Sequence, residues 1–119
     1  MILSFSSWTV EFYTDSRGRS PAVEFLRQLT ETEKAKIDHH IAMLSIKGVD
    51  ERVPGAKKIA GHSPLWELRP DKYRIIYVAH AGRRFIILHA FQKKTPKTPL
   101  GEISTAERRY NEFLKRERE

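Results

Sequence analysis

The stretch LWELRPDKYRIIYVAHAGRRFIILHAF, residues 65 to 91, contains three apolar runs separated by two short polar segments. The runs LWELR, YRIIYVAH and FIILHAF are rich in β-branched and aromatic residues, which are typical of strands. The segments PDK and AGRR are short enough to connect neighbouring antiparallel strands by tight turns. The stretch therefore predicts a three-stranded antiparallel meander, and this meander decides the fold class.

Upstream of the meander, the sequence predicts a strand and then a helix. WTVEFYTD, residues 8 to 15, alternates apolar and polar side chains and predicts a half-buried strand. Ser20 and Pro21 suit the N-cap and the first position of a short helix over residues 22 to 29. AKKI, residues 56 to 59, predicts a short extended piece before the meander.

Two capping boxes predict the remaining helices. Thr30 and Glu33 mark the start of a second helix, for which Gly48 is the stop signal. Ser104 and Glu107 repeat the capping pattern and predict the start of a C-terminal helix. The order of N-terminal strand, two-helix hairpin, antiparallel meander and C-terminal helix predicts an α+β fold, with the helices packed on one face of the sheet.

The composition favours a single small domain. The chain has 119 residues and no cysteine, which suits one domain over residues 1 to 119 and excludes disulfide scaffolds and cysteine-based zinc or redox sites. The first residues, MILSFSSW, lack the length and basic start of a signal peptide. No apolar run approaches the roughly 20 residues of a membrane span. We expect a cytoplasmic protein with no membrane contact, no cofactor and no metal site.

Positive charge is concentrated in the middle of the chain. The formal net charge is +7, and residues 52 to 97 hold eleven Lys or Arg against two Asp or Glu. This block coincides with the predicted strands. It indicates an anionic partner, such as nucleic acid, a membrane surface or an acidic protein, or else a solvated basic face.

A cationic segment follows the last predicted strand. KKTPKTP, residues 93 to 99 and here called the lip, holds Lys93, Lys94 and Lys97 in a backbone that two prolines restrict. Such a segment is suited to clamp the phosphates of a polynucleotide. The alternative is a basic loop that protects the end of a strand against aggregation.

These features together resemble the RelE/ParE superfamily of type II toxins, and most closely its HigB-like, phage-derived branch. The matching features are the WELR and YRIIY strands, the aliphatic strand after them, and the lip before a helix that begins near EI. The resemblance extends from about Trp8 to Leu114. It implies an mRNA endonuclease that acts on the ribosome, in contact with rRNA, and a helix-turn-helix antitoxin as partner.

The resemblance also implies which residues carry catalysis. The family attributes it to basic residues on the strands and after the last strand, which here are Arg69, Arg74, Lys93 and Lys94. Arg69 and Arg74 flank a predicted turn and can converge on one phosphate, although a register slip of one residue would put them on opposite faces. The aromatic residue that some relatives carry shortly after the basic run is missing from TPKTPL.

Four further residues are candidate RNA contacts: Lys57, Lys58, Tyr73 and Lys97. The general base stays unidentified. His62 is expected in a loop, and alternation groups His89 with the buried Phe85 and Ile87, as a core histidine would be. Lys93 or Lys94, crowded by neighbouring cations, is another candidate base. His39 and His40 lack a metal-ligand partner at helical spacing.

Two other functions remain open. A ParE-like protein would poison gyrase by binding it, without cutting RNA. A plain RNA-binding module would bind without chemistry, and its strand arginines would only pair with carboxylates such as Glu67. Fold alone does not choose between these functions.

Overall fold

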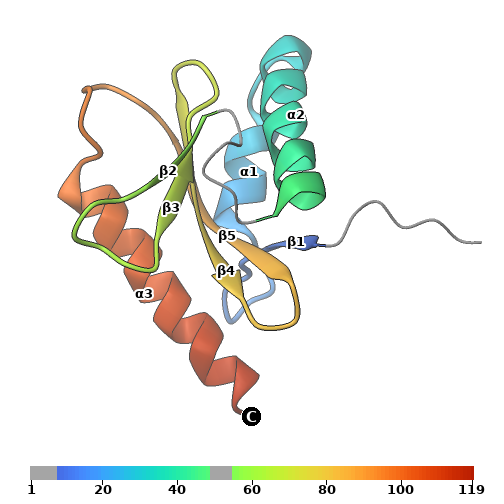
Figure 1. Ribbon diagram of the computed structural model, residues 1–119, viewed down its shortest axis with the longest axis vertical. Helices are drawn as coiled ribbons and strands as arrows, with labels where there is room; N and C mark the ends of the chain where they lie inside the picture. Colours follow the sequence, from blue (N-terminus) through green and yellow to red (C-terminus); the bar gives the residue numbers. More distant parts are fainter. Residues whose placement is uncertain (1–7, 49–54) are drawn as a thin grey trace, which may run out of the picture.

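The computed structural model describes residues 8–48 and 55–119, which form a five-stranded sheet flanked by three helices (Figure 1). The elements in chain order are β1 (Thr9–Phe12), α1 (Pro21–Arg27), α2 (Glu31–Lys47), β2 (Ala56–Lys58), β3 (Trp66–Leu68), β4 (Tyr73–His80), β5 (Arg84–Gln92) and α3 (Leu100–Glu117). The lip is the orange segment that joins β5 to α3 in Figure 1. The predicted α+β class and the RelE-like order of elements are confirmed.

The strand order in the sheet is β1-β5-β4-β3-β2. Strands β3, β4 and β5 form the predicted antiparallel meander, and the extended piece before them adds β2 as an antiparallel edge strand. The N-terminal strand β1 pairs in parallel with β5 at the other edge, with Thr9 opposite Arg84. Arg84 also donates hydrogen bonds to Glu11 on β1 and to Glu117 on α3, so one side chain joins both ends of the described chain to the sheet.

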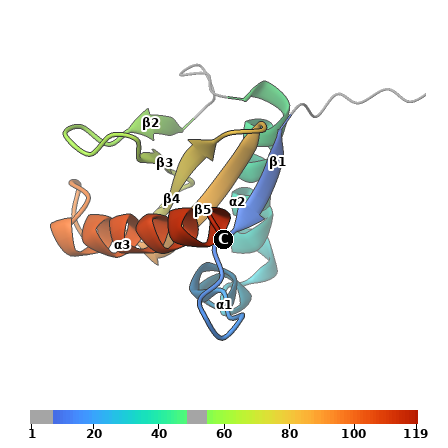
Figure 2. The ribbon, with the colours of Figure 1, turned by 90° about the horizontal axis from the view of Figure 1, so that it is seen from below.

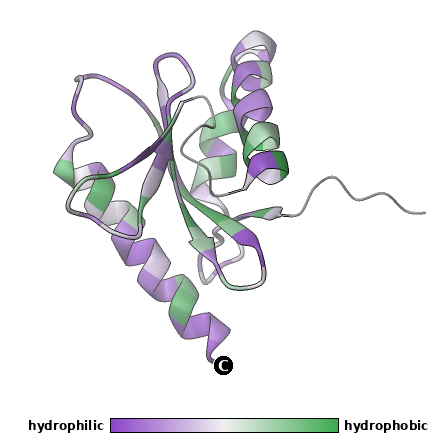
Figure 3. Ribbon diagram, viewed as in Figure 1, coloured by the Kyte–Doolittle hydropathy of each residue, from purple (hydrophilic) through white to green (hydrophobic). Residues whose placement is uncertain are grey.

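Helices cover both faces of the sheet, so the prediction that they share one face was wrong. Figure 2 shows α3 on one side of the sheet and α1 and α2 on the other. Ile37 and Leu44 of α2 pack with Phe85, whereas Ile103 and Ala106 of α3 belong to a separate core. The physical reason is that β4 and β5 are buried along most of their length rather than at alternate residues, so both faces require a cover. Figure 3 shows much of these two strands in the green of hydrophobic residues.

The predicted N-terminal helix signals are confirmed. Ser20 accepts a hydrogen bond from the Val23 amide, and Thr30 and Glu33 form a complete capping box. Gly48 ends α2 with a φ of 71°, where a Cβ atom would lie 2.5 Å from Trp8 Nε1. Only glycine fits this position without strain, because the left-handed region and the close approach both exclude a side chain.

The C-terminal helix begins before its predicted capping box. Pro99 is the N-cap of α3 and makes no side-chain cap hydrogen bond, and Ser104 lies inside the helix. Proline is tolerated at a helix start because the first amides have no intrahelical acceptor. The earlier start adds the turn that carries Glu102 and the buried Ile103.

A β-bulge in the β4–β5 ladder changes the face on which His89 lies. Ile76 is opposite His89, but the next residue, Tyr77, is opposite Ile87, so β5 holds one extra residue there. The prediction that His89 shares the face of Phe85 and Ile87, which assumed regular alternation along the strand, was therefore wrong. His89 lies on the other face, where it contacts Glu102 of α3.

Candidate nucleic-acid interface

Arg69 and Arg74 lie on the same face of the sheet, the face that α3 covers. Glu67 pairs with Ile76 and Leu68 with Ile75, and continuing this register by one pair places Arg69 opposite Arg74. Ile76 belongs to the core under α3, so alternation puts both arginines on that side. The register slip that would have separated them does not occur.

Arg74 is buried, and its guanidinium makes hydrogen bonds to the turn between β3 and β4. It is 5% exposed, and its Nη1 donates hydrogen bonds to the carbonyls of Asp71 at 3.1 Å and Tyr73 at 2.7 Å. Burial lowers the pKa of Arg74, the positive charge of Arg69 lowers it further, and Glu67 opposes both effects. An arginine remains charged under these conditions, so Arg74 supplies a fixed positive charge behind the surface.

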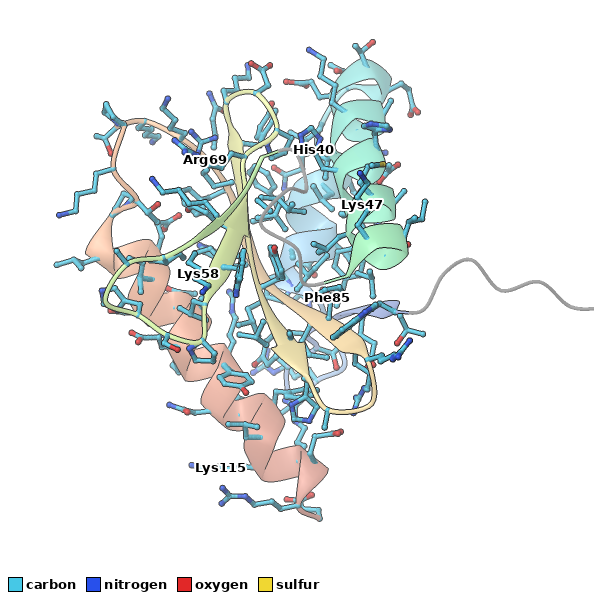
Figure 4. The ribbon with its side chains drawn as sticks, in the orientation of Figure 1. His40, Lys47, Lys58, Arg69, Phe85 and Lys115 are labelled. Carbon is cyan, nitrogen blue, oxygen red and sulfur yellow. The ribbon has the colours of Figure 1, made fainter. Side chains whose placement is uncertain are left out.

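A pocket of about 250 Å³, here called the cationic pocket, lies between the β2–β3 hairpin, the lip and the start of α3. Four predicted site residues line it: Lys57, Lys58, Arg69 and Lys97. Figure 4 shows Lys58 and Arg69 on the β2–β3 side, away from Lys47 on α2 and from Lys115 near the end of α3. Lys58 contributes to the wall of the pocket, but its Nζ lies 5.5 Å from the centroid of the Trp66 ring, on the other face of the β2–β3 hairpin. The charges that meet at the pocket are therefore those of Lys57, Arg69 and Lys97.

Glu67 lines the same pocket and is a functional candidate that the sequence analysis treated only as an arginine partner. The residue is 6% exposed and accepts a hydrogen bond from Thr98 Oγ1 at 2.7 Å. Its Oε1 lies 3.9 Å from Arg69 Nε, which is the one fully buried side-chain N or O atom without a hydrogen bond among residues 8–48 and 55–119. Alternation along WELR was the available signal, because it places Glu67 and Arg69 on one face.

Lys93 and Lys94 are exposed at the same end of the sheet but outside the cationic pocket. The Lys93 amide donates to the carbonyl of Lys72 at 2.6 Å, which continues the β4–β5 pairing by one residue. Lys94 lines a second pocket of about 420 Å³ with Phe25 and Phe91. The three lip lysines therefore form a charged rim, of which Lys97 lines the cationic pocket and Lys94 lines the second pocket.

Tyr73 lies on the opposite face of the sheet and is 3% exposed. Its hydroxyl donates a hydrogen bond to Glu33 of α2. This bond raises the pKa of Tyr73 to about 12 and, together with the cap hydrogen bonds from Thr30, lowers that of Glu33 to about 2. The buried ring has no free face on which a nucleobase could stack, so Tyr73 lies outside the candidate interface.

The two candidate histidines, His89 and His62, contact charged groups. His89 Nε2 lies 3.1 Å from Glu102 and its Nδ1 lies 3.0 Å from Arg109, both on α3, and burial lowers its pKa. His62 lines the cationic pocket, with its Nδ1 3.5 Å from Glu107. Within the described residues, no group of three or more potential ligands can hold a metal ion. Nor does any helix there have the length and apolarity to cross a membrane.

Fold and pocket together define a small α+β protein with a cationic site at one end of its sheet. Residues 24–111 match the family described as phage derived protein Gp49-like (DUF891). The chain belongs to this Gp49-like family, and the predicted resemblance to the phage-derived branch is confirmed.

A solved structure of another protein has a similar fold. One chain of the archaeal RelE–RelB complex from Pyrococcus horikoshii OT3 matches with a TM-score of 0.52 and 18% sequence identity. The match covers 74% of this chain and 97% of that one. The comparison with curated proteins gave no significant match. The fold is therefore RelE-like.

Proposed function

We propose that the protein is the toxin of a type II toxin–antitoxin pair and that it cuts mRNA on the ribosome. The Gp49-like family and the RelE-like fold support the toxin class. The cationic pocket supports the nuclease reading within that class, because it gathers cations where a phosphodiester can enter. Because the proposed substrate is mRNA on the ribosome, the proposal implies that the protein acts in the cytoplasm.

One observation carries the proposal: Lys57, Arg69 and Lys97 line a single pocket, and the charge of Arg74 lies behind it. A polynucleotide backbone is the ligand that such a group of cations favours. Arginine adds a planar fork that donates two parallel hydrogen bonds to phosphate oxygens.

The pocket suits RNA cleavage by the 2′-hydroxyl of the substrate itself. That reaction passes through a phosphorane-like transition state with extra negative charge on its oxygens. Fixed cations that point at this charge lower the barrier, and removing one such donor typically slows a reaction by about 100- to 1,000-fold. Arg69 is the residue we assign to this role. The chemistry requires no metal ion.

The partners follow from the same proposal. The substrate is mRNA in the ribosomal decoding site, and the charged rim meets rRNA. The matched archaeal RelE was solved in a complex with RelB, and we propose an antitoxin for this chain as well: a small helix-turn-helix protein encoded beside it.

Induced expression followed by primer extension on a cellular mRNA tests the function. We expect discrete cuts within codons that disappear in Arg69→Ala and persist in Lys115→Ala, a control cation distant from the pocket. The cut 5′ fragment should end in a 2′,3′-cyclic phosphate, and a 2′-deoxy nucleotide at the cut site should block cleavage.

Two outcomes would replace the proposal with another function. Intact mRNA with a DNA-damage response would indicate a gyrase poison. Intact mRNA together with retained RNA binding by the purified protein would indicate a binding module without chemistry.

A further inference from the structure

We propose that Glu67 is the general base of the cleavage reaction, an inference that rests on the proposed function. Glu67 is a buried carboxylate that lines the pocket together with the cations Lys57, Arg69 and Lys97. Isolated buried carboxylates are costly, and they persist where they are paired or needed. The question is therefore what its oxygens are positioned to do.

The sheet places Glu67 in the floor of the pocket. It stands directly opposite Lys57 on β2 and Ile76 on β4. Lys57 lines the rim, whereas Ile76 is fully buried under α3. The carboxylate thus lies between the positively charged opening and the apolar core, where a substrate hydroxyl would reach it from the Lys57 side.

The two carboxylate oxygens have different partners. Thr98 Oγ1 donates to Oε2 at 2.7 Å, which fixes the orientation of the group from the lip. Oε1 makes no hydrogen bond within the described part of the chain, and its 3.9 Å separation from Arg69 Nε exceeds hydrogen-bond distance. One oxygen is therefore held, and the other is available as a proton acceptor.

The Arg69 guanidinium complements this arrangement. The Arg69 side chain is 37% exposed, so the part of the guanidinium beyond the buried Nε presents donors to the pocket beside the Glu67 acceptor. A ribonucleotide offers the matching pair, since its phosphate accepts and the adjacent 2′-hydroxyl donates. DNA lacks the hydroxyl and would leave the Glu67 oxygen without a partner.

Other candidate bases are less well placed. Both ring nitrogens of His89 are engaged by α3. His62 also lines the pocket, but its Nδ1 lies 3.5 Å from Glu107, which engages the ring. Lys93 and Lys94 lie outside the pocket, so neither shares the site with Arg69. Glu67 is held by Thr98 inside the pocket that Arg69 and Lys57 line, with one carboxylate oxygen left as an acceptor.

The step balances without any further cofactor. Glu67 Oε1 takes the proton of the 2′-hydroxyl, and the 2′-oxygen forms a bond to phosphorus. The bond from phosphorus to the 5′-oxygen breaks, and that oxygen leaves with the electron pair and takes a proton from water. Glu67 then returns its proton to solvent, and a 2′,3′-cyclic phosphate remains.

Single-turnover cleavage of a defined mRNA on programmed ribosomes tests the assignment. We expect Glu67→Gln to slow cleavage by about 100- to 10,000-fold, as the loss of a general base does. Binding to ribosomes that carry a 2′-deoxy version of the mRNA should be unchanged. Glu31→Gln is the matched control, since Glu31 is 97% exposed on α2. Added formate should restore part of the rate to Glu67→Ala, because the small acid enters the vacated space.

Each outcome has a defined meaning. A wild-type protein that cuts no mRNA overturns the proposed function, and this inference with it. Active wild-type protein with an equally active Glu67→Gln variant overturns the inference alone. If the Gln and Ala variants do not fold, Glu67→Asp decides, because it keeps the charge but withdraws the oxygen by one methylene. A rate loss near 100-fold is expected from such a displacement, and an unchanged rate refutes the role.

Discussion

Replacing Lys97 with alanine should reduce the salt dependence of RNA binding by one phosphate contact. Three charged side chains line the cationic pocket on the Glu67 face: Lys57, Arg69 and Lys97. If each neutralises one phosphate of single-stranded RNA, log K falls with log salt at a slope of about −2.1, since each contact contributes about −0.7. Without Lys97, the expected slope is about −1.4.

These slopes translate into affinities that are easy to measure. Between about 50 mM and about 200 mM salt, the wild-type protein should lose about 20-fold in affinity and Lys97→Ala about 7-fold. Fluorescence anisotropy with a short labelled RNA that carries 2′-deoxy nucleotides measures binding without cleavage. The same change should appear for RNAs of different sequence, because phosphate contacts do not read bases.

Two controls decide whether the pocket is responsible. Lys47→Ala and Lys115→Ala remove one positive charge each from helices distant from the pocket (Figure 4). They should leave the slope near the wild-type value. A slope that falls equally in all three variants would mean that RNA responds to net charge alone. A Lys97→Ala slope equal to the wild-type slope would refute the assignment of Lys97 as a phosphate contact.

Three further predictions concern stability. Tyr73→Phe removes the donor that holds the pKa of Glu33 near 2. A lowered carboxylate pKa stabilises the fold above about pH 4.5, and this stabilisation is lost as the pH falls towards 2. The variant should therefore be less stable than wild type at neutral pH, and the two acid-unfolding curves should converge at low pH. Leu68→Ala empties a fully buried site and should cost about 2–5 kcal/mol in urea unfolding; a loss below about 1 kcal/mol would contradict the packing. Gly48→Ala forces a side chain onto Trp8 at a positive φ and should cost more than about 1 kcal/mol in the same assay.

The parts of the fold that sequence predicted were those that local interactions determine. The Thr30–Glu33 capping box and the short turns of the meander depend on neighbours within a few positions. The parallel partner of β1, the face that α3 covers and the bulge at His89 depend on distant segments. Hydrophobic periodicity carries no information about such pairings.

The candidate site shows the same division. Positive charge could be counted along the chain, and this pointed to the lip, whereas the family resemblance implied Arg69. Which cations share a pocket depended on the β3–β4 register and on the path of the lip, and these place Lys97 with Arg69 but Lys94 elsewhere. Glu67 was overlooked because its burial and its bond to Thr98 arise only after residues far apart in the chain meet.

The parallel pairing of β1 with β5 determines when the sheet can be completed during synthesis. Val10 and Phe12 leave the ribosome early, but Phe85 and Ile87, the residues opposite them, are translated only after both helices of the hairpin and the strands β2 to β4. Contacts between such distant parts of a chain form late, since closing a long loop costs entropy. The first strand to be made is therefore the last that can take its place, and a nascent chain halted before β5 would lack one edge of its sheet.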